Sequence, residues 1–262
     1  PLSQDLNAMR QTLLLGGLES LAYNINRKVS DVLLYEFGNT YNKYGDEFVE
    51  AHRLALWMTG VKQEENWNVT ASKVDFFYMK GFVEKVLQRL GLHQGVSSCT
   101  IQSDLLSEGL LYKIRKKKVI EFGAVRKSIL KKFGIKQEVM YADFNWNLIM
   151  TMLKDQKTKY KEVSKFPSVR RDLALLVDRQ ITFAEIEGIA FQSDKSLLKK
   201  VSLFDVYEGD KLPSDKKSYA LSFLFSDEKQ TLTDKVVDKS ILKIFTTLEQ
   251  KLKVELRDGT LK

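Results

Sequence analysis

Apolar residues recur every three or four positions near the start of the chain, which is the spacing of one helix face. The pattern predicts a helix with one buried stripe, made of Leu14, Leu18, Leu21, Ala22 and Ile25. Gly16 and Gly17 lie at the front of this stripe, although each glycine inside a helix costs about 0.5–1 kcal/mol relative to alanine. Either another backbone approaches closely at these glycines, or the helix begins only at Leu18.

The rest of the first half predicts an antiparallel sheet with packed helices. Asp75 is a plausible N-cap and Gly91 ends the helix that follows it. Gly38 is expected to form a bulge, and a basic run, Lys113–Lys118, surrounds a hairpin turn. The expected elements are strands at 33–41, 53–60 and 139–146, helices at 75–90 and 128–134, and a hairpin at 110–125.

The closing part of the chain has a cleaner order of elements. Thr182 and Glu185 have the spacing of a capping box, and Thr233 or Asp234 caps a second helix. In order, we expect strand 171–177, the Thr182 helix, strand 201–207, strand 218–225, the Thr233 helix and strand 254–256. This β-α-β-β-α-β order is the split βαβ, or ferredoxin-like, arrangement.

Alternation of side chains predicts which face of that sheet the helices cover. One set is strongly apolar and is expected to be covered: Leu173, Leu175, Val177, Tyr219, Leu221, Phe223 and Phe225. The opposite set is small or polar: Arg170, Asp172, Ala174, Ser218, Ala220 and Ser222. Small residues let an RNA backbone come close, and arginine and lysine contact phosphates, unlike a sheet that stacks bases on aromatic rings. A merely solvated face is the alternative, and strand 201–207 does not choose between its faces.

Composition indicates an ordinary globular protein of 262 residues, 44% hydrophobic and 29% charged, long enough for two domains. We place them at 1–155 and 166–262, with a polar linker at 156–165. No apolar run approaches the roughly 18 residues of a membrane span, and Cys99 is the single cysteine, so we expect a cytoplasmic protein. The net charge of +8 favours a polyanionic partner, although lysine-rich surfaces also serve solubility. His52, His93 and Cys99 lack neighbours with metal-site or catalytic spacing, so we expect no catalytic residue and no metal site.

Four blocks follow one another in the closing part: Lys165-Phe-Pro-Ser-Val-Arg-Arg-Asp-Leu-Ala, Leu203-Phe-Asp-Val-Tyr-Glu-Gly209, Lys216-Lys-Ser-Tyr-Ala-Leu-Ser-Phe and Gln230-Thr-Leu-Thr-Asp234. They resemble the anticodon-binding domain of bacterial phenylalanyl-tRNA synthetase beta subunits. Upstream, Tyr35-Glu-Phe-Gly38 and Asp75-Phe-Phe-Tyr-Met-Lys-Gly81 resemble that subunit's synthetase-like domain. The chain begins at Pro1, and we interpret it as the C-terminal part of a longer subunit.

The resemblance implies an α+β protein in which a class II synthetase-like antiparallel sheet domain precedes a ferredoxin-like domain. It implies an (αβ)₂ heterotetramer that uses ATP and Mg²⁺ to form phenylalanyl-adenylate and then esterifies tRNA(Phe). The chemistry would belong to the alpha subunit, so this chain is expected to hold no cofactor and to be inactive alone. Its expected partners are tRNA(Phe) and the alpha subunit, and a non-enzymatic interaction scaffold is the alternative.

Two groups of residues are therefore predicted to act in binding. The RNA-binding group is Arg170, Arg171, Lys216, Lys217, Ser218, Ala220 and Ser222. The apolar stripe suits packing against another subunit, so the interface group is Leu14, Gly16, Gly17, Leu18, Leu21 and Ile25. The basic run Lys113–Lys118 either contacts RNA or is a solvated hairpin tip.

Overall fold

The chain folds into two compact units, Pro1–Thr158 and Lys159–Lys262, and each is described by itself. The structure is a computed structural model that describes residues 7–154, 160, 162, 164–209 and 212–257. The predicted linker, 156–165, spans the boundary between the units, and part of it lies outside the described residues. The limits proposed for the two domains stay a prediction.

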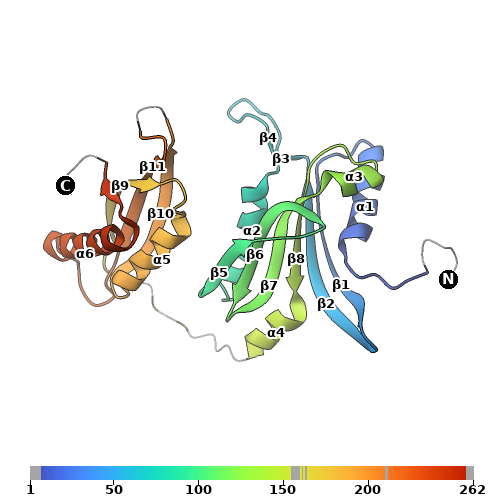
Figure 1. Cartoon of the computed structure of the whole chain (residues 1–262), viewed down its shortest axis with the longest axis horizontal. Coiled ribbons are helices and arrows are strands. Elements are labelled where there is room, and N and C mark those ends of the chain that lie inside the picture. Colours follow the sequence, from blue (N-terminus) through green and yellow to red (C-terminus); the bar gives the residue numbers. More distant parts are fainter. Residues whose placement is uncertain (1–6, 155–159, 161, 163, 210–211, 258–262) are drawn as a thin grey trace. The chain divides into compact units, whose positions relative to one another are not determined.

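The first unit is built on a six-stranded antiparallel sheet with strand order β1-β2-β8-β7-β6-β5 (Figure 1). A short pair, β3 and β4, lies apart from it. The helices are α1 (Leu14–Asn26), α2 (Phe76–Arg89), α3 (Lys127–Lys132) and α4 (Trp146–Lys154). The strands are β1 (Val32–Tyr44), β2 (Glu47–Thr59), β3 (Val61–Gln63), β4 (Ser72–Lys73), β5 (Val96–Thr100), β6 (Leu106–Ile114), β7 (Lys117–Val125) and β8 (Val139–Asn145).

Helices cover both faces of this sheet, so the unit has two separate cores. On one face, α2 and α4 bury Met79, Val83 and Ile149 against strand residues such as Phe122 and Phe144. On the other face, α1 and α3 pack against a second set of strand residues, namely Val32, Ala55, Trp57, Val125, Val139 and Tyr141. A sheet buried on both faces explains why β8 reads as a nearly continuous apolar run.

Several details of the first unit differ from the prediction. Helix α1 begins at Leu14, so both glycines lie inside it, and the prediction of a start at Leu18 is wrong. Gly38 is not a bulge, because it pairs with Arg53 in an uninterrupted β1–β2 ladder. Strand β5 was not predicted, because its short polar sequence has no apolar alternation, and neither was helix α4, which follows β8 directly. Asp75 caps α2 as predicted, since its carboxylate accepts a hydrogen bond from the Tyr78 amide at 2.7 Å.

The second unit has the predicted β-α-β-β-α-β order, with a four-stranded sheet ordered β10-β11-β9-β12. Its elements are β9 (Val169–Asp178), α5 (Phe183–Ser193), β10 (Leu198–Tyr207), β11 (Lys216–Phe225), α6 (Asp234–Leu252) and β12 (Glu255–Leu256). Thr182 and Glu185 form the predicted capping box, whereas the Thr233 side chain makes no cap hydrogen bond. The predicted α+β fold, an antiparallel sheet domain followed by a ferredoxin-like domain, is thereby confirmed.

Helices α5 and α6 cover one face of the second sheet (Figure 1). The covered residues are those predicted from alternation: Leu173, Leu175, Val177, Tyr219, Leu221, Phe223 and Phe225. They pack against α5 through Ile186 and against α6 through Val237 and Ile244. No described helix covers the opposite face of this sheet.

A polar pair lies on the α1 side of the first sheet, where β2 and β8 are neighbours. Arg53 Nη1 lies 3.7 Å from Asp143 Oδ2, and both side chains are about one quarter exposed, at 27% and 25%. Arg53 Nε and Asp143 Oδ1 are buried and have no hydrogen-bond partner in the part of the chain that the structure describes. Burial raises the pKa of Asp143 to about 6, with Arg53 opposing the rise and Glu121 adding to it.

Replacing Asp143 by asparagine is expected to remove part of the pH dependence of stability. Between its ordinary value of 3.8 and about 6, the folded carboxyl holds a proton that the unfolded one has lost. The contribution of Asp143 to stability therefore falls as pH rises through this window, by about 1–2 kcal/mol after allowing for solvent screening. Urea denaturation of both proteins from pH 4 to 7 measures this fall in the free energy of unfolding. The same pH slope in Asp143→Asn and the parent would contradict the assignment.

Candidate nucleic-acid interface

The helix-free side of the second sheet, called here the open face, is set by strand register. Ala220 on β11 pairs with Ala174 on β9 and with Asp205 on β10, and Ser222 pairs with Asp172. Small side chains thus form a floor across the three strands, as alternation predicted. The open face consists of Arg170, Asp172, Ala174, Leu176, Asp178, Lys200, Ser202, Phe204, Asp205, Tyr207, Lys216, Ser218, Ala220, Ser222, Leu224 and Glu255.

The two predicted arginines point to opposite sides of the sheet. Arg170 lies on the open face, where Nε and Nη2 donate to the two carboxylate oxygens of Asp172 at 2.8 and 3.0 Å. Arg171 instead reaches α6, with Nη2 2.6 Å from Asp234 and Nε 3.2 Å from Asp238. These hydrogen bonds raise the pKa of both arginines. Arg171 therefore ties β9 to the first turns of α6 and does not face the open side.

The two predicted lysines are also engaged within the chain. Lys216 pairs with Glu255, which raises the pKa of the lysine. Lys217 is only 8% exposed and places its ammonium 4.7 Å from the centre of the Tyr219 ring, on the helix-covered side. Ser218 belongs to the open face but is 3% exposed, so it offers almost no surface. Of the predicted RNA-binding group, Arg170, Lys216, Ala220 and Ser222 lie on the open face with accessible surface, and Lys216 is paired there with Glu255.

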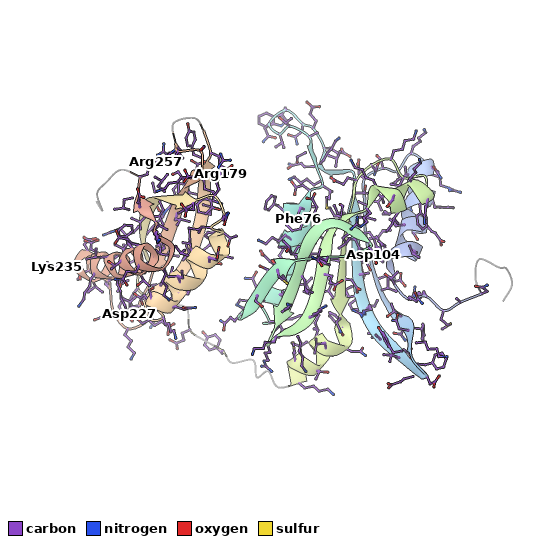
Figure 2. The ribbon with its side chains drawn as sticks, viewed as in Figure 1. Phe76, Asp104, Arg179, Asp227, Lys235 and Arg257 are labelled. Atoms are coloured by element: carbon purple, nitrogen blue, oxygen red, sulfur yellow. The ribbon has the colours of Figure 1, made fainter. Side chains whose placement is uncertain are left out.

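Two aromatic rings lie on the open face, each beside an arginine. The guanidinium carbon of Arg170 is 5.5 Å from the centre of the Phe204 ring, which is 56% exposed. That of Arg257, at the end of the described chain (Figure 2), is 5.2 Å from the centre of the Tyr207 ring. The open face therefore offers flat π-surfaces and cations above a floor of small residues. The expectation of a face without aromatic stacking surfaces is wrong.

Phe204 and Tyr207 were not predicted as site residues because β10 is irregular. A register shift between Leu203 and Asp205 lets Leu203 face the covered side while Phe204, Asp205 and Tyr207 lie toward the open one. Such a shift defeats strict alternation, which is why the faces of this strand could not be assigned. The usable signal was the block around Phe204 and Tyr207 that carried the family resemblance.

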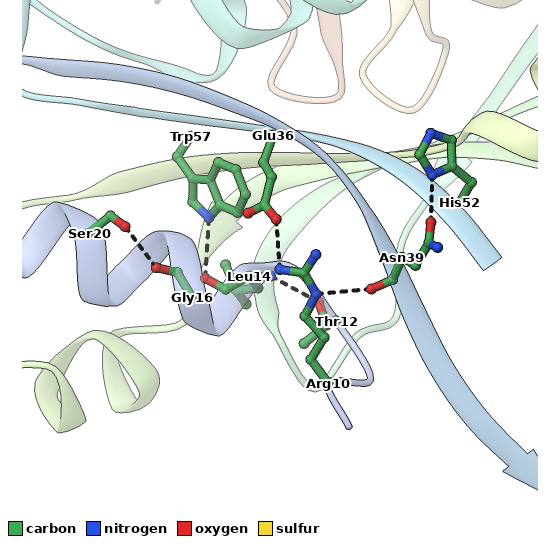
Figure 3. A network of polar contacts seen from close by, with 9 residues as sticks. All are labelled: Arg10, Thr12, Leu14, Gly16, Ser20, Glu36, Asn39, His52 and Trp57. Atoms are coloured by element: carbon green, nitrogen blue, oxygen red, sulfur yellow. Dashed lines mark hydrogen bonds and ion pairs between the residues drawn. The ribbon is translucent and has the colours of Figure 1, made fainter. Parts of the chain in front are cut away.

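Helix α1 packs against the sheet of its own unit, so its apolar stripe is not a free surface (Figure 3). The indole N–H of Trp57 donates to the Leu14 carbonyl at 3.3 Å, and Gly17 lies against the indole ring. Leu14, Leu18 and Leu21 are fully buried in this core. The apolar stripe is thus satisfied by intramolecular packing and gives no support for a partner helix, while Gly16 faces open space and Ile25 is half-buried. A subunit contact through α1 stays a prediction.

The more exposed apolar surface of the first unit lies on β1, an edge strand of the six-stranded sheet. Leu33, Tyr35 and Phe37 alternate along one side of β1, and Tyr35 is 72% exposed. The Tyr35 and Phe37 rings meet edge to face at 6.4 Å, and Phe37 contacts Trp146 at 4.8 Å. We call Leu33, Tyr35 and Phe37 the β1 strip. Contiguous apolar surface on a long edge strand is typical of a surface that another chain covers.

The described residues do not assemble a metal or nucleophile site. Among the described residues, no group of three histidine, cysteine, aspartate or glutamate side chains could hold a metal ion. The Cys99 thiol lies 3.9 Å from the Leu111 carbonyl, and His52 contacts the Asn39 amide. Among the helices that the structure describes, none combines the length and apolar character needed to cross a bilayer.

An antiparallel sheet unit followed along the chain by a ferredoxin-like unit, with rings and arginines on its open face, defines a two-unit α+β class of protein. The chain belongs to the phenylalanyl tRNA synthetase beta chain family: the model of that chain's CLM domain matches residues 1–146. The model of the ferredoxin-fold anticodon binding domain matches residues 164–257. The family resemblance noted in the sequence is thereby confirmed.

Curated relatives agree over nearly the whole chain. Phenylalanine–tRNA ligase beta subunits from Bacteroides fragilis and Porphyromonas gingivalis are 46% and 41% identical over 98% of this chain and 33% of their own length. The chain thus spans about a third of the curated relatives it matches. A solved pyrrolysyl-tRNA synthetase from Desulfitobacterium hafniense covers 55% of this chain and 50% of its own, with a TM-score of 0.43 and 14% identity, too weak a likeness to carry an argument.

Proposed function

We propose that this chain serves phenylalanine–tRNA ligase as part of its beta subunit, where the second unit binds the anticodon region of tRNA(Phe) on the open face. The observation that carries this proposal is the pair of ring–arginine contacts, Phe204 with Arg170 and Tyr207 with Arg257, above small residues. Splayed-out loop bases stack on aromatic rings and on guanidinium planes. Ala174, Ala220 and Ser222 leave room for such bases to approach the sheet.

Charge alone does not account for binding at this face. Asp172 neutralises Arg170 and Glu255 neutralises Lys216, while Asp205 offsets one of the two further cations, Lys200 and Arg257. Phosphate neutralisation is therefore a minor part of the interaction, and stacking with hydrogen bonds to base edges is the major part. Carboxylates such as that of Asp205 can accept hydrogen bonds from exocyclic amines and so support base discrimination.

The first unit supplies the contact with the alpha subunit through the β1 strip, within an (αβ)₂ heterotetramer that works in the cytoplasm on tRNA. ATP and Mg²⁺ would be used by the whole ligase. The described residues of this chain do not fit a site for the metal, because they hold no group of three potential ligands. Within this proposal, the catalytic steps belong to the alpha subunit. A second candidate function, a protein-interaction scaffold without an RNA role, is favoured only by the β1 strip.

Replacing Tyr207 by alanine is expected to weaken binding of a tRNA(Phe) anticodon stem-loop to the assembled ligase by about 5- to 150-fold. That range corresponds to the roughly 1–3 kcal/mol that one base–aromatic stack contributes. Because the ring carries no charge, the salt dependence of binding should stay as in the parent. Fluorescence anisotropy of a labelled stem-loop, titrated at several salt concentrations, measures both quantities.

Phe77→Ala is the matched control, because this exposed ring lies on α2 in the first unit. It should leave stem-loop affinity unchanged, and both variants should still co-purify with the alpha subunit. Equal affinity of Tyr207→Ala and the parent, with retained co-purification, would reject the RNA role and favour the scaffold.

A further inference from the structure

The turn between β6 and β7 gathers cations without any acidic neighbour in sequence. Five of them, Lys113, Arg115, Lys116, Lys117 and Lys118, lie in the stretch 109–120, which contains no Asp or Glu. The last four are exposed. No carboxylate within the described ranges forms an ion pair with any of the five. We call these residues the basic tip.

The backbone of the basic tip is unfavourable for the residues that occupy it. Ile114 pairs with Lys117, which leaves a two-residue turn made of Arg115 and Lys116. Both have left-handed backbones, with φ of 49° and 65°. Two consecutive positive φ angles define the type I′ turn, where asparagine and glycine are preferred because a β-carbon is disfavoured there. Folding alone would not select an Arg-Lys pair at this turn.

A second unfavourable feature lies one step along the hairpin. Lys113 and Lys118 are direct partners across the two strands. Like charges placed opposite each other repel and destabilise a sheet. The turn is unfavourable because of its backbone conformation, and the strand pairing is unfavourable because two like charges face each other. A bound anion would relieve the charge repulsion.

We propose that the basic tip binds the phosphate backbone of an RNA, as a site separate from the open face. The tip offers no exposed aromatic ring or amide for reading bases, so the contact is independent of sequence. Guanidinium and ammonium groups on a fixed two-residue turn suit phosphate oxygens spaced along one strand. The inference rests on the proposed function only for the identity of the RNA, a tRNA.

The first experiment neutralises the tip in the assembled ligase with Arg115→Gln, Lys116→Gln, Lys117→Gln and Lys118→Gln combined. Binding of full-length tRNA(Phe) is measured by filter retention between 50 and 200 mM salt. The slope of log affinity against log salt should become shallower by about 2–3, since each phosphate contact contributes about 0.7–0.9. A slope change of 2 makes the loss of affinity over this fourfold range about 16-fold smaller.

The matched control removes the same charge from α6, with Lys235→Gln, Lys239→Gln, Lys243→Gln and Lys251→Gln combined. Figure 2 labels the first of these lysines, Lys235. These lysines are exposed on a helix that lies across the sheet from the open face. The control should keep the parent's slope. An equal change in both variants would show a general effect of net charge and would overturn the proposal.

A second variant separates RNA binding from folding. Arg115→Asn with Lys116→Gly installs the pair that a type I′ turn prefers, so the melting temperature should rise while tRNA binding weakens. An unchanged salt slope in this variant and in the quadruple variant would overturn the proposal and leave a solvated tip. Loss of alpha-subunit co-purification with normal tRNA binding would also overturn it, because the tip would then face an acidic protein surface.

Failure of this proposal can be told from failure of the proposed function. Tip variants change the salt slope, whereas Tyr207→Ala changes affinity at every salt concentration. If Tyr207→Ala binds RNA as tightly as the parent while the tip variants have a shallower salt slope, only the open face is rejected. If Tyr207→Ala weakens binding while the tip variants keep the parent's salt slope, only the tip is rejected.

Discussion

Replacing Phe223 by alanine is expected to lower the free energy of unfolding of the second unit by about 3–5 kcal/mol. Phe223 is fully buried on β11, an inner strand of the four-stranded sheet, and belongs to the core shared with α5 and α6. Removal of the ring loses its transfer free energy and leaves a cavity that packed neighbours on both helices cannot fill. For a unit of about this size, the melting temperature should fall by at least about 12 °C.

Differential scanning calorimetry tests this prediction and the independence of the two units. Each unit buries its own hydrophobic core among the residues that the structure describes. We therefore expect two thermal transitions, of which Phe223→Ala shifts one. Leu242→Ala on the exposed side of α6 is the control and should change stability by less than about 0.5 kcal/mol. A single transition that moves as a whole would contradict independent unfolding.

Replacing Gly17 by alanine is expected to destabilise the first unit by about 1–3 kcal/mol, the usual cost of overpacking a filled core. A β-carbon at Gly17 would overlap atoms of the indole ring of Trp57. The ring cannot swing aside without losing its hydrogen bond to the Leu14 carbonyl and its packing against Tyr141. Helix α1 would have to move away from the sheet.

The neighbouring glycine provides the control, because Gly16 has open space where a β-carbon would lie. Gly16→Ala should stabilise the unit by about 0.5–1 kcal/mol through the better helix propensity of alanine. Urea denaturation of the two variants measures the pair of effects. Two changes of the same sign would contradict the packing of α1 described here.

Much of the candidate site followed from local patterns in the sequence. The floor of Ala174, Ala220 and Ser222 was predicted because strands alternate strictly wherever the ladder is regular. Phe204 and Tyr207 were missed because a register shift in β10 breaks that alternation. Arg257 was missed because it follows β12 and meets Tyr207 only when the closing strand returns to the sheet.

For the predicted cations, strand position could be read from nearby sequence, whereas the acidic partners of two of them lie far along the chain. Type and strand position placed Arg170, Arg171, Lys216 and Lys217 near the open face. The structure engages three of them with acidic groups and buries Lys217 beside Tyr219. Those acidic partners include Asp234 and Glu255, more than 35 residues away along the chain. A residue's type shows that it carries charge, whereas its surroundings decide whether that charge is free.

By itself, the sequence determined the order of elements in the second unit, its covered face, and the family. These depend on periodicity, capping residues and short blocks, all of which are local. Only the tertiary structure decided that the α1 stripe packs on Trp57, that β1 carries an exposed apolar strip, and that rings and arginines meet on the open face. Each of these depends on which distant residues become neighbours, and strand register and helix docking set that through packing of the whole unit.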